Sequence, residues 1–531
     1  MANPGQGESK QAVPKQELQP HPVMEQLAGV QYCVNSPPPW KDAVLLGFQH
    51  YILTLGTTVL IPTMTVSQMG GDNAEKARVI QTLLFLSGFN TLMQTMFGTR
   101  LPSVVGGSHT FLLPVLSIIH AKRYNKFQEP HERFAQTMRG IQGSLIIASI
   151  LQMTLGFLGL WRNIVKYLSP LSVVPLVTYT GLGLYYLAFP MLGKCLEIGL
   201  AELVLIVLIS QYLPTYVTFK RPICDRFAVL LSVSITWTCA GILTLSGAYR
   251  KSTDALNSCR TDSSGLVHGA PWIYVPYPFQ WGPPTFDAGE MLVMMVASFA
   301  SSIESTGSFL ATSRYGSATP VPPSILSRGI GWMGIGTLLG GMCGSVTGFS
   351  ASIENSGALA LTRVGSRRVI QISAAFMIFF SVFGKFGAIF ASIPLPIMAA
   401  LYCIFCGLFS SAGLSNLQFC NLNSFRTKFI LGLSFSLGFS VPLFFREHWI
   451  ASNHGPLHTH SRWFDNMISV LLTSHASVAV MIAMVLDCTL GRVNNENGKD
   501  WWEKFAVYGK DIRTDEFYQL PWNLNKFFPS F

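Results

Sequence analysis

Residues 340–362 read GGMCGSVTGFSASIENSGALALT, and residues 101–114 read LPSVVGGSHTFLLP. Both stretches are apolar enough to lie at membrane depth, yet Gly, Ser and Thr run through their middles. Backbone that is not helical is tolerated at that depth only where it is buried in protein or lines a cavity. We therefore expect both stretches to be interrupted spans that face one central site.

Long apolar runs recur around these stretches, from residue 43 to residue 487. Of the 531 residues, 49% are hydrophobic and 12% are charged, whereas soluble proteins carry about 25% charged residues. Barrel strands would instead alternate polar and apolar residues over about 10 positions. The sequence predicts an all-α polytopic membrane protein with fourteen transmembrane spans, near 43–61, 79–98, 103–119, 140–160, 169–189, 199–217, 227–247, 288–312, 325–341, 343–360, 369–391, 395–411, 427–444 and 466–488.

The two interrupted stretches are the third and the tenth of these spans. Matching interrupted segments in the two halves of a chain indicate a transporter built from inverted repeats. Because each half would hold seven spans, an odd number, the second half must enter the membrane from the opposite side. We expect a 7+7 inverted repeat.

The two ends of the chain are polar tails, 1–40 and 489–531, and the first lacks the apolar region of a signal peptide. An even number of spans places both tails on one side, and their basic residues favour the cytoplasm. The net charge of +10 suits loops that face anionic lipid headgroups. The sequence has no basic stripe interleaved with aromatic residues, which argues against nucleic-acid binding.

The ten cysteines show no framework of disulfides or metal ligands. Cys403 and Cys406 lie in one apolar run and are expected to pack in the core. Cys259 lies in a long polar loop without an obvious partner, so no structural disulfide is expected there. The sequence shows no metal-ligand spacing, phosphate-binding loop or nucleophile–base set. We therefore expect no bound metal, no cofactor and no enzymatic activity.

Two acidic residues lie deep in apolar runs, Glu304 in ASFASSIESTGSFLA and Glu354 in SVTGFSASIENSGALA. A charged side chain at the bilayer centre costs at least about 2.5–3.5 kcal/mol, so such a residue marks a site or a pathway by default. The alternative is a protonated Glu that bonds a neighbouring helix. Most other acidic residues are expected near water, typically Asp42, Asp225, Asp287, Glu290, Asp465 and Asp487.

Other polar side chains also fall inside predicted spans. Gln49 and His50 are neighbours in the first span, and His109 lies in the interrupted third span. Buried polar groups are normally hydrogen-bonded, so a structural role for Gln49 and His50 is as plausible as a functional one. The position of His109 favours a site. We expect Lys385 to be a structural partner or to snorkel, and His475 to be a core residue.

Residues 354–363 read ENSGALALTR, and VGSRRV follows at 364–369. The decapeptide resembles the signature of the nucleobase–ascorbate transporter family (nucleobase:cation symporter-2), [Q/E/P]-N-x-G-x-x-x-x-T-[R/K/G]. The tails and the GSRR continuation resemble its plant branch. Three further parts of this chain resemble landmarks of the family, namely Gln49–His50, SHTF at 108–111 and Glu304 in ESTG.

The resemblance implies a UraA-like fold, with a core domain that moves against a gate domain in an elevator-like motion. Short β-strands in spans three and ten would hold the substrate. The family is usually dimeric, so the resemblance implies a homodimer in the plasma membrane. The implied division is a cytoplasmic tail at 1–40, core spans at 41–160 and 288–392, gate spans at 161–250 and 393–488, an extracellular loop at 251–287 and a second cytoplasmic tail at 489–531.

The resemblance also implies roles for individual residues. Glu304 would accept N–H groups of a nucleobase, Glu354 would contact substrate or a proton, and both would carry the coupling protons. The rest of the implied substrate site is Asn355, Ser352, Ile353, His109, Thr110, Ser108, Phe111, Gln49 and His50. The residues that would position the motif are Gly357, Thr362, Arg363 and Ser308. Ser308 stands where the family often has Asp or His, which disfavours sodium.

Together these features predict a symporter that carries nucleobases of the xanthine, uric acid or uracil class with protons across the lipid bilayer. An ascorbate transporter of the same family is the first alternative, disfavoured because that branch tends to have Pro where this chain has Glu354. An anion exchanger of the same broad fold is the second. It would want fixed positive charge near the interrupted helices.

Overall fold

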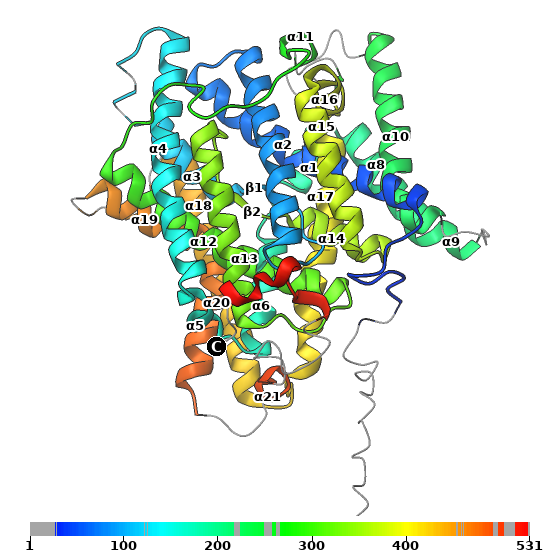
Figure 1. Ribbon diagram of the computed structural model, residues 1–531, viewed down its shortest axis with the longest axis vertical. Coiled ribbons are helices and arrows are strands. Elements are labelled where there is room, and N and C mark those ends of the chain that lie inside the picture. Colours follow the sequence, from blue (N-terminus) through cyan, green and yellow to red (C-terminus); the bar gives the residue numbers. More distant parts are fainter. Residues whose placement is uncertain are drawn as a thin grey trace, which may run out of the picture.

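The computed structural model describes residues 27–528 apart from 28, 122, 125, 217–222, 249–257, 262–265, 453–454, 458, 460, 492–496 and 504–515. Figure 1 shows a bundle of helices with a pair of short strands at its centre. The elements of the first half are α1 (Trp40–Met69), α2 (Asn73–Met96), β1 (Val105–Gly107), η2 (His109–Phe111), α3 (Leu112–Ile119), α4 (Pro130–Phe157), α5 (Leu160–Val165), α6 (Pro170–Leu182), α7 (Phe189–Leu192), η3 (Gly193–Cys195), α8 (Leu196–Val207), the π-helical η4 (Leu208–Tyr212), α9 (Leu213–Tyr216) and α10 (Ile223–Leu245).

The second half repeats a broken segment between long helices. Its elements are α11 (Leu266–Gly269), α12 (Ala288–Tyr315), α13 (Pro323–Cys343), β2 (Phe349–Ala351), α14 (Ile353–Thr362), α15 (Arg367–Val382), α16 (Gly384–Ala391), α17 (Leu395–Ser415), η6 (Asn416–Phe419), α18 (Phe425–Ser452), α19 (Arg462–Thr473), α20 (His475–Thr489), α21 (Lys499–Glu503) and η7 (Pro521–Phe527).

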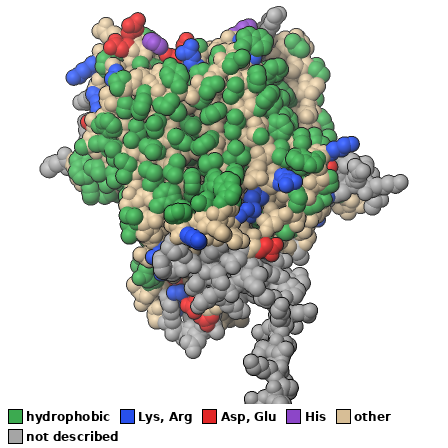
Figure 2. All heavy atoms as spheres, in the orientation of Figure 1, with side chains coloured by type: hydrophobic (Ala, Val, Ile, Leu, Met, Phe, Trp, Pro, Cys, Tyr) green, Lys and Arg blue, Asp and Glu red, His purple; other side chains and the backbone are tan. Residues whose placement is uncertain are grey.

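Five of the described helices are long and apolar enough to cross a membrane. The number rises to seven if each of two bent pairs is one span, α15 with α16, bent by 109°, and α19 with α20, bent by 80°. Figure 2 shows the matching surface, a broad hydrophobic band with charged side chains gathered toward its two ends. The fold is therefore helical and polytopic, and the division into fourteen spans stays a prediction.

The turn between α1 and α2 shows how local sequence sets these elements. α1 ends at Gly70, whose φ is 96°, a conformation that glycine adopts without steric cost. A Cβ there would also lie 2.8 Å from the Pro130 carbonyl oxygen. α2 begins with a capping box, in which the Asp72 side chain accepts from Glu75 N and the Glu75 side chain accepts from Asp72 N.

The helices pack as two groups. We call α1–α5 and α12–α16, with their strands, the core group, in which α13 packs along α4 and α15 along α1 and α2. We call α6–α10 and α17–α20 the gate group, in which α6 packs along α17 and α20. α12 and α14 contact both groups, because α12 also packs on α6 and α19, and α14 packs on α17.

A disulfide joins Cys195 and Cys259, whose Cα atoms lie 5.5 Å apart. The prediction that Cys259 has no structural disulfide was wrong. The partner stands 64 residues earlier, in η3, and only the packing of α8 against α10 brings the two loops together. Within the same group Cys406 is buried and packs with Ala188 and Tyr402, as expected for a core cysteine.

One acidic residue expected near water, Asp487, is fully buried, and so is a second carboxylate, that of Glu202. Glu202 in α8 is 0% exposed and accepts hydrogen bonds of 2.6 Å from both Ser232 and Thr236 of α10. Asp487, near the end of α20, is 0% exposed and pairs with Arg426 at 2.7 Å. The prediction failed because both lie near the ends of their apolar runs, where sequence alone cannot show that a neighbouring helix covers the carboxylate.

Candidate functional site

The two interrupted stretches meet at the centre of the molecule. β1 and β2 pair antiparallel, with Val105 opposite Ala351 and Gly107 opposite Phe349. Two further main-chain bonds extend the pairing, from Ser108 N to Gly348 O at 3.0 Å and from Ser352 N to Val104 O at 2.8 Å. The ladder satisfies backbone groups that a break in a helix would leave unpaired at membrane depth.

A helical segment begins directly after each strand. η2 and α3 follow β1, and α14 follows β2. The Ser352 side chain caps α14 by accepting from Asn355 N at 3.3 Å. Helix N-termini carry unsatisfied N–H groups and partial positive charge. The ladder therefore brings two such termini near one another, an arrangement that favours an acceptor or an anion beside them.

Glu304 projects from α12 toward this centre and joins the two helix groups. One carboxylate oxygen accepts from Thr110 Oγ1 of η2 at 2.5 Å, and the other accepts from Ser474 Oγ at 2.8 Å. Ser474 occupies the bend between α19 and α20, where its hydroxyl also accepts from Ser477 N. Glu304 is thus hydrogen-bonded to a segment of the core group and to a segment of the gate group at the same time.

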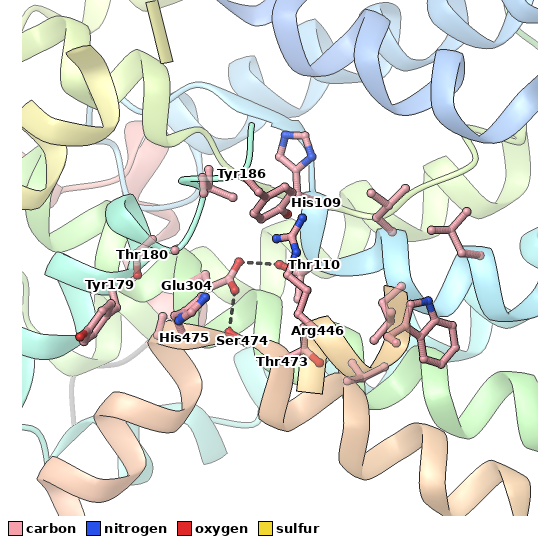
Figure 3. Close-up of a pocket in the computed structure, with 18 of the residues that line it drawn as sticks. His109, Thr110, Tyr179, Thr180, Tyr186, Glu304, Arg446, Thr473, Ser474 and His475 are labelled. Atoms are coloured by element: carbon pink, nitrogen blue, oxygen red, sulfur yellow. Dashed lines mark hydrogen bonds between the residues drawn. The ribbon is translucent and has the colours of Figure 1, made fainter. Parts of the chain in front are cut away.

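A cavity of ≈ 300 Å³ opens beside Glu304. Figure 3 shows Glu304 between Thr110 and Ser474, with His109 and Arg446 nearby. Side chains from both groups of helices form the wall, and some of them are polar and others apolar. Its lining is Met64, His109, Thr110, Leu112, Leu113, Leu116, Tyr179, Thr180, Gly183, Leu184, Tyr186, Glu304, Arg446, Trp449, Ile450, Val470, Thr473, Ser474, His475 and Ala476.

His109 presents unused hydrogen-bonding capacity in this wall. Both of its ring nitrogens are buried and have no hydrogen-bond partner among the described residues. A buried polar atom without a partner is costly, so each such atom calls for an explanation. Because both nitrogens are covered by neighbouring atoms, a ligand in the cavity would bond them only after the imidazole turns toward it.

Arg446 supplies the positive charge of the cavity. It projects from α18, with its guanidinium 3.4 Å from the centroid of the Tyr186 ring and 5.7 Å from that of Tyr185. Such a cation is held by the negative face of an aromatic ring. The cavity therefore contains an acceptor, Glu304, and a fixed cation, Arg446, on different helices.

A second polar network lies on the core side of the ladder. His50 Nδ1 lies 2.8 Å from Asn355 Oδ1, and Asn355 Nδ2 donates to Thr54 Oγ1 and to Ser352 Oγ, at 3.2 and 2.9 Å. Ser352 Oγ in turn donates to Glu354 at 2.6 Å. This chain connects Glu354, which is 4% exposed, to the first helix.

The structure thus divides the predicted site residues between the cavity and its surroundings. Glu304, His109 and Thr110 line the cavity. The residues that lie around the ladder without lining the cavity are Glu354, Asn355, Ile353, Ser352, Ser108, Phe111, Gln49 and His50. Among these, the Gln49 side-chain amide has no partner in the described part of the chain.

The last residues of the decapeptide shape α14. Thr362 Oγ1 donates to Ala358 O at 2.8 Å, and Arg363 ends the helix with φ 55°. The Arg363 carbonyl accepts from Gln31 N at 2.9 Å, which ties the amino-terminal segment to the motif. The fourth predicted positioning residue, Ser308, is buried, and its hydroxyl has no partner among the described residues.

At Gly357, α14 approaches the backbone of α17 closely. A Cβ at this position would lie 2.4 Å from the Phe405 carbonyl oxygen and 2.9 Å from two other backbone atoms of that residue. We expect Gly357→Ala to push α14 off α17 and to lower thermal stability, because overpacking costs about 1–3 kcal/mol. Gly407→Ala is the matched control, because a Cβ there meets nothing within 4 Å. Melting of the detergent-solubilised protein checks this, and equal melting of the two variants would contradict it.

Sequence reasoning missed the gate-side half of the cavity. Arg446 and Tyr186 were not singled out, because each stands near the end of an apolar run, where charged and aromatic residues are ordinary. His475 is buried, as predicted, but it also lines the cavity, stacks on Tyr179 and lies 2.9 Å from Gly438 O.

The comparisons with known proteins identify the family of the chain. A family model described as the Permease family matches residues 41–447. The chain belongs to this family. It is 58% identical to nucleobase-ascorbate transporter 7 of Arabidopsis thaliana, over 97% of this chain and 96% of that one. It is 54% identical to nucleobase-ascorbate transporter LPE1 of Zea mays, over 98% and 99% of the two chains.

These relatives confirm the resemblance drawn from the decapeptide. The chain is a membrane transporter of the nucleobase–ascorbate transporter family, and it is not an enzyme. Two solved structures are more distant. SLC26A9 is 14% identical, over 84% of this chain and 65% of that one, with a TM-score of 0.48, and the transmembrane domain of the cyanobacterium bicarbonate transporter BicA is 12% identical, over 84% and 97%, with a TM-score of 0.40.

Proposed function

We propose that this transporter carries nucleobases of the xanthine, uric acid or uracil class together with protons across the plasma membrane. The observation that carries the proposal is the Glu304 carboxylate in the wall of the cavity. An ionised carboxylate only accepts hydrogen bonds. It therefore suits a ligand that presents N–H groups on one edge.

The rest of the cavity complements the other edges of such a base. A keto purine or pyrimidine offers carbonyl acceptors beside its N–H donors, and Arg446 can donate to those carbonyls. His109 lines the same wall, and its ring can donate one hydrogen bond and accept one once it turns toward the ligand. The apolar remainder of the lining, such as Leu113 and Ile450, covers the flat faces of a ring. This mixture of apolar walls and a few directed polar groups is typical of small-molecule sites.

Ascorbate is the second candidate, and Arg446 is the observation that favours it. Ascorbate is an anion at neutral pH, and the fixed positive charge that an anion would want is present in the cavity. Glu304 opposes it, because ascorbate has no ring N–H groups for the carboxylate to accept from. Uptake of isotopically labelled xanthine in a transport-deficient cell, with unlabelled bases and ascorbate as competitors, decides between the two.

Arg446→Gln separates these candidates further. If Arg446 binds the carbonyl edge of a base, its loss removes a hydrogen bond to a charged group, worth about 1.5–3 kcal/mol. We expect the KM for base uptake to rise by about tenfold or more, with little change in maximal rate. Glu447→Gln, on the exposed neighbouring residue, is the control. Unchanged base uptake combined with lost ascorbate uptake would overturn the nucleobase assignment.

The disulfide supports a cytoplasmic location for both tails. Disulfides persist in oxidising compartments, so the end of the molecule that carries Cys195 and Cys259 faces outward. Thr261, two residues after Cys259, bonds the Thr244 hydroxyl near the end of α10. In Figure 1 the end of α10 and α11 lie at the upper end, while α21 of the C-terminal tail lies toward the lower end. In the described part of the N-terminal tail, Asn35 Nδ2 donates to Glu516 O of the C-terminal tail. The tail side is then the cytoplasm.

The site also fits a transporter whose two groups of helices move against each other. The cavity wall is shared, with His109 and Glu304 from the core group and Arg446 and His475 from the gate group. A ligand between them is released when one group slides past the other. We propose that the core group is the moving body, that residues 41–160 and 288–392 form it, and that the protein works as a homodimer.

A further inference from the structure

The two groups of helices are closed against each other on the tail side. Tyr315, at the end of α12, donates its hydroxyl to Leu408 O of α17 and lies 3.0 Å from Ser411 Oγ. The neighbouring Arg314 places its guanidinium 5.8 Å from the centroid of the Phe419 ring. These contacts cross from the core group to the gate group. We call this line of contact the cytoplasmic seam.

The C-terminal tail reaches this seam through Trp502. Trp502 of α21 is half-buried and packs against the main hydrophobic core. It also lines a small cavity of ≈ 30 Å³ together with residues of both groups, among them Leu310 and Arg314 of α12, and Asn416 and Phe419 of η6. Trp502 is therefore placed between the two groups, at the point where the seam would have to open.

The residues just before α21 are attached to the gate group. Asn497 Nδ2 donates to the Asp487 carboxylate of α20 at 3.0 Å, and Asn497 O accepts from Leu171 N of α6 at 3.4 Å. Gly498, with φ +72°, lies against Phe419 O, which a Cβ would approach to 2.6 Å. The segment 497–503 is thus anchored on gate helices and extends its tryptophan to the core side.

A second tail segment, 516–520, is attached to the core group. Arg328 donates to Tyr518 O at 3.1 Å, Arg367 donates to Phe517 O at 2.9 Å, and Arg100 donates to Gln519 O. The Tyr518 ring is 0% exposed, and its hydroxyl donates to Thr319 O at 2.5 Å. Three arginines thus donate to successive main-chain carbonyls and fix the position of this segment. Hydrogen bonds from a charged donor are stronger than those between neutral groups.

We propose that the C-terminal tail is a cytoplasmic latch that stabilises the arrangement in which the seam is closed. The chain links the gate-anchored segment to the core-anchored segment through residues 504–515, so engagement of one anchor raises the local concentration of the other. This inference rests on the proposed movement of the core group against the gate group. It does not depend on which ligand is carried.

The latch can act only through contacts that differ between the open and the closed seam. Tyr518 contacts core residues, so it would travel with the core group and keep its bonds. Trp502 lies against both groups, so opening the seam removes part of its contact. Removal of the Trp502 side chain should accordingly shift the equilibrium toward the open seam. Tyr518 instead holds segment 516–520 on the core group in both arrangements.

Two cysteine reporters test the latch. Ile450→Cys reports on the cavity beside Glu304, which Ile450 lines, and Ser313→Cys reports on the seam, where Ser313 lines the small cavity. Each is labelled by an impermeant maleimide in vesicles of the matching orientation, with the parent protein as the background for native cysteines. The measured quantity is the labelling rate at 450 divided by that at 313, without substrate.

We expect Trp502→Ala to lower this ratio by about fivefold or more, the change that loss of one packed side chain produces in a two-state equilibrium. Trp502→Phe should restore most of it, and Phe527→Ala, at an exposed position of the same tail, should leave it unchanged. Trp502→Leu replaces the alanine variant if the latter does not reach the membrane. Because Trp502 and Ser313 line the same small cavity, the latch also requires the labelling rate at 450 to fall. An unchanged rate at 450 in Trp502→Ala overturns the latch even if uptake is normal, whereas a fall at 450 with a rise at 313 supports it even if the carried ligand is not a nucleobase.

Discussion

We expect Glu304→Gln to weaken nucleobase binding itself, and not only transport. Gln keeps the size of the side chain but replaces one acceptor oxygen by an N–H₂ donor and removes the charge. Thr110 and Ser474 already donate to the two carboxylate oxygens, so the amide would face at least one donor of its own kind. Each lost hydrogen bond to a charged group costs about 1.5–3 kcal/mol. The affinity for a base should therefore fall by about a hundredfold.

Radioligand binding or a ligand-induced thermal shift on purified protein measures this directly. Glu202→Gln is the matched control, because Glu202 is also buried and also accepts from two hydroxyls, those of Ser232 and Thr236. It lies outside the cavity, so its variant should bind the base normally. Binding at wild-type strength in Glu304→Gln would place the base elsewhere and remove the assignment of the cavity.

The parts of the site that local composition encodes were visible in the sequence. Glycine and hydroxyl residues at 101–114 and 340–362 marked the interruptions, and β1 and β2 lie within these two stretches. Glu304 was visible because a carboxylate in a long apolar run is rare and costly. Each of these signals is visible within one segment, because its residues are unusual for a membrane span. Neither requires knowledge of the helices that pack against that segment.

The parts that depend on contacts between helices were not visible. The Cys195–Cys259 disulfide joins loops whose proximity follows from the packing of α8 on α10. Arg446 stands close to the end of its apolar run and reaches the cavity by the length of its side chain, as long basic residues do. Glu202 was missed for the opposite reason, because a position near the start of an apolar run proved to be fully covered.

The two deep carboxylates occupy different places relative to the cavity. Glu304 lines it, whereas Glu354 lies behind the strand ladder and bonds Ser352. Asn355 then links Ser352 to His50 of α1. We propose that Glu304 contacts the substrate and a proton, while Glu354 exchanges a proton through this network and holds the start of α14.

This division predicts that uptake is driven by protons. An ionised carboxylate is costly to carry past the gate group, and protonation removes that cost. A substrate and a proton that each favour the same loaded state bind cooperatively, since coupling between two ligands is reciprocal. We expect uptake to rise as the external pH falls from about 8 toward about 5.5 and to collapse with a protonophore, because a lower pH supplies more of the coupled ligand.

Sodium provides the control for the same experiment. A sodium ion prefers oxygen ligands with negative charge, and Ser308, one helical turn after Glu304, contributes a neutral hydroxyl instead of a carboxylate. Replacing sodium by choline should therefore leave uptake unchanged. Glu354→Gln should flatten the pH dependence while base binding persists, because Glu354 is outside the cavity wall. Uptake that requires sodium, or that ignores the proton gradient, would reject proton coupling and leave the assignment of Glu304 to the substrate intact.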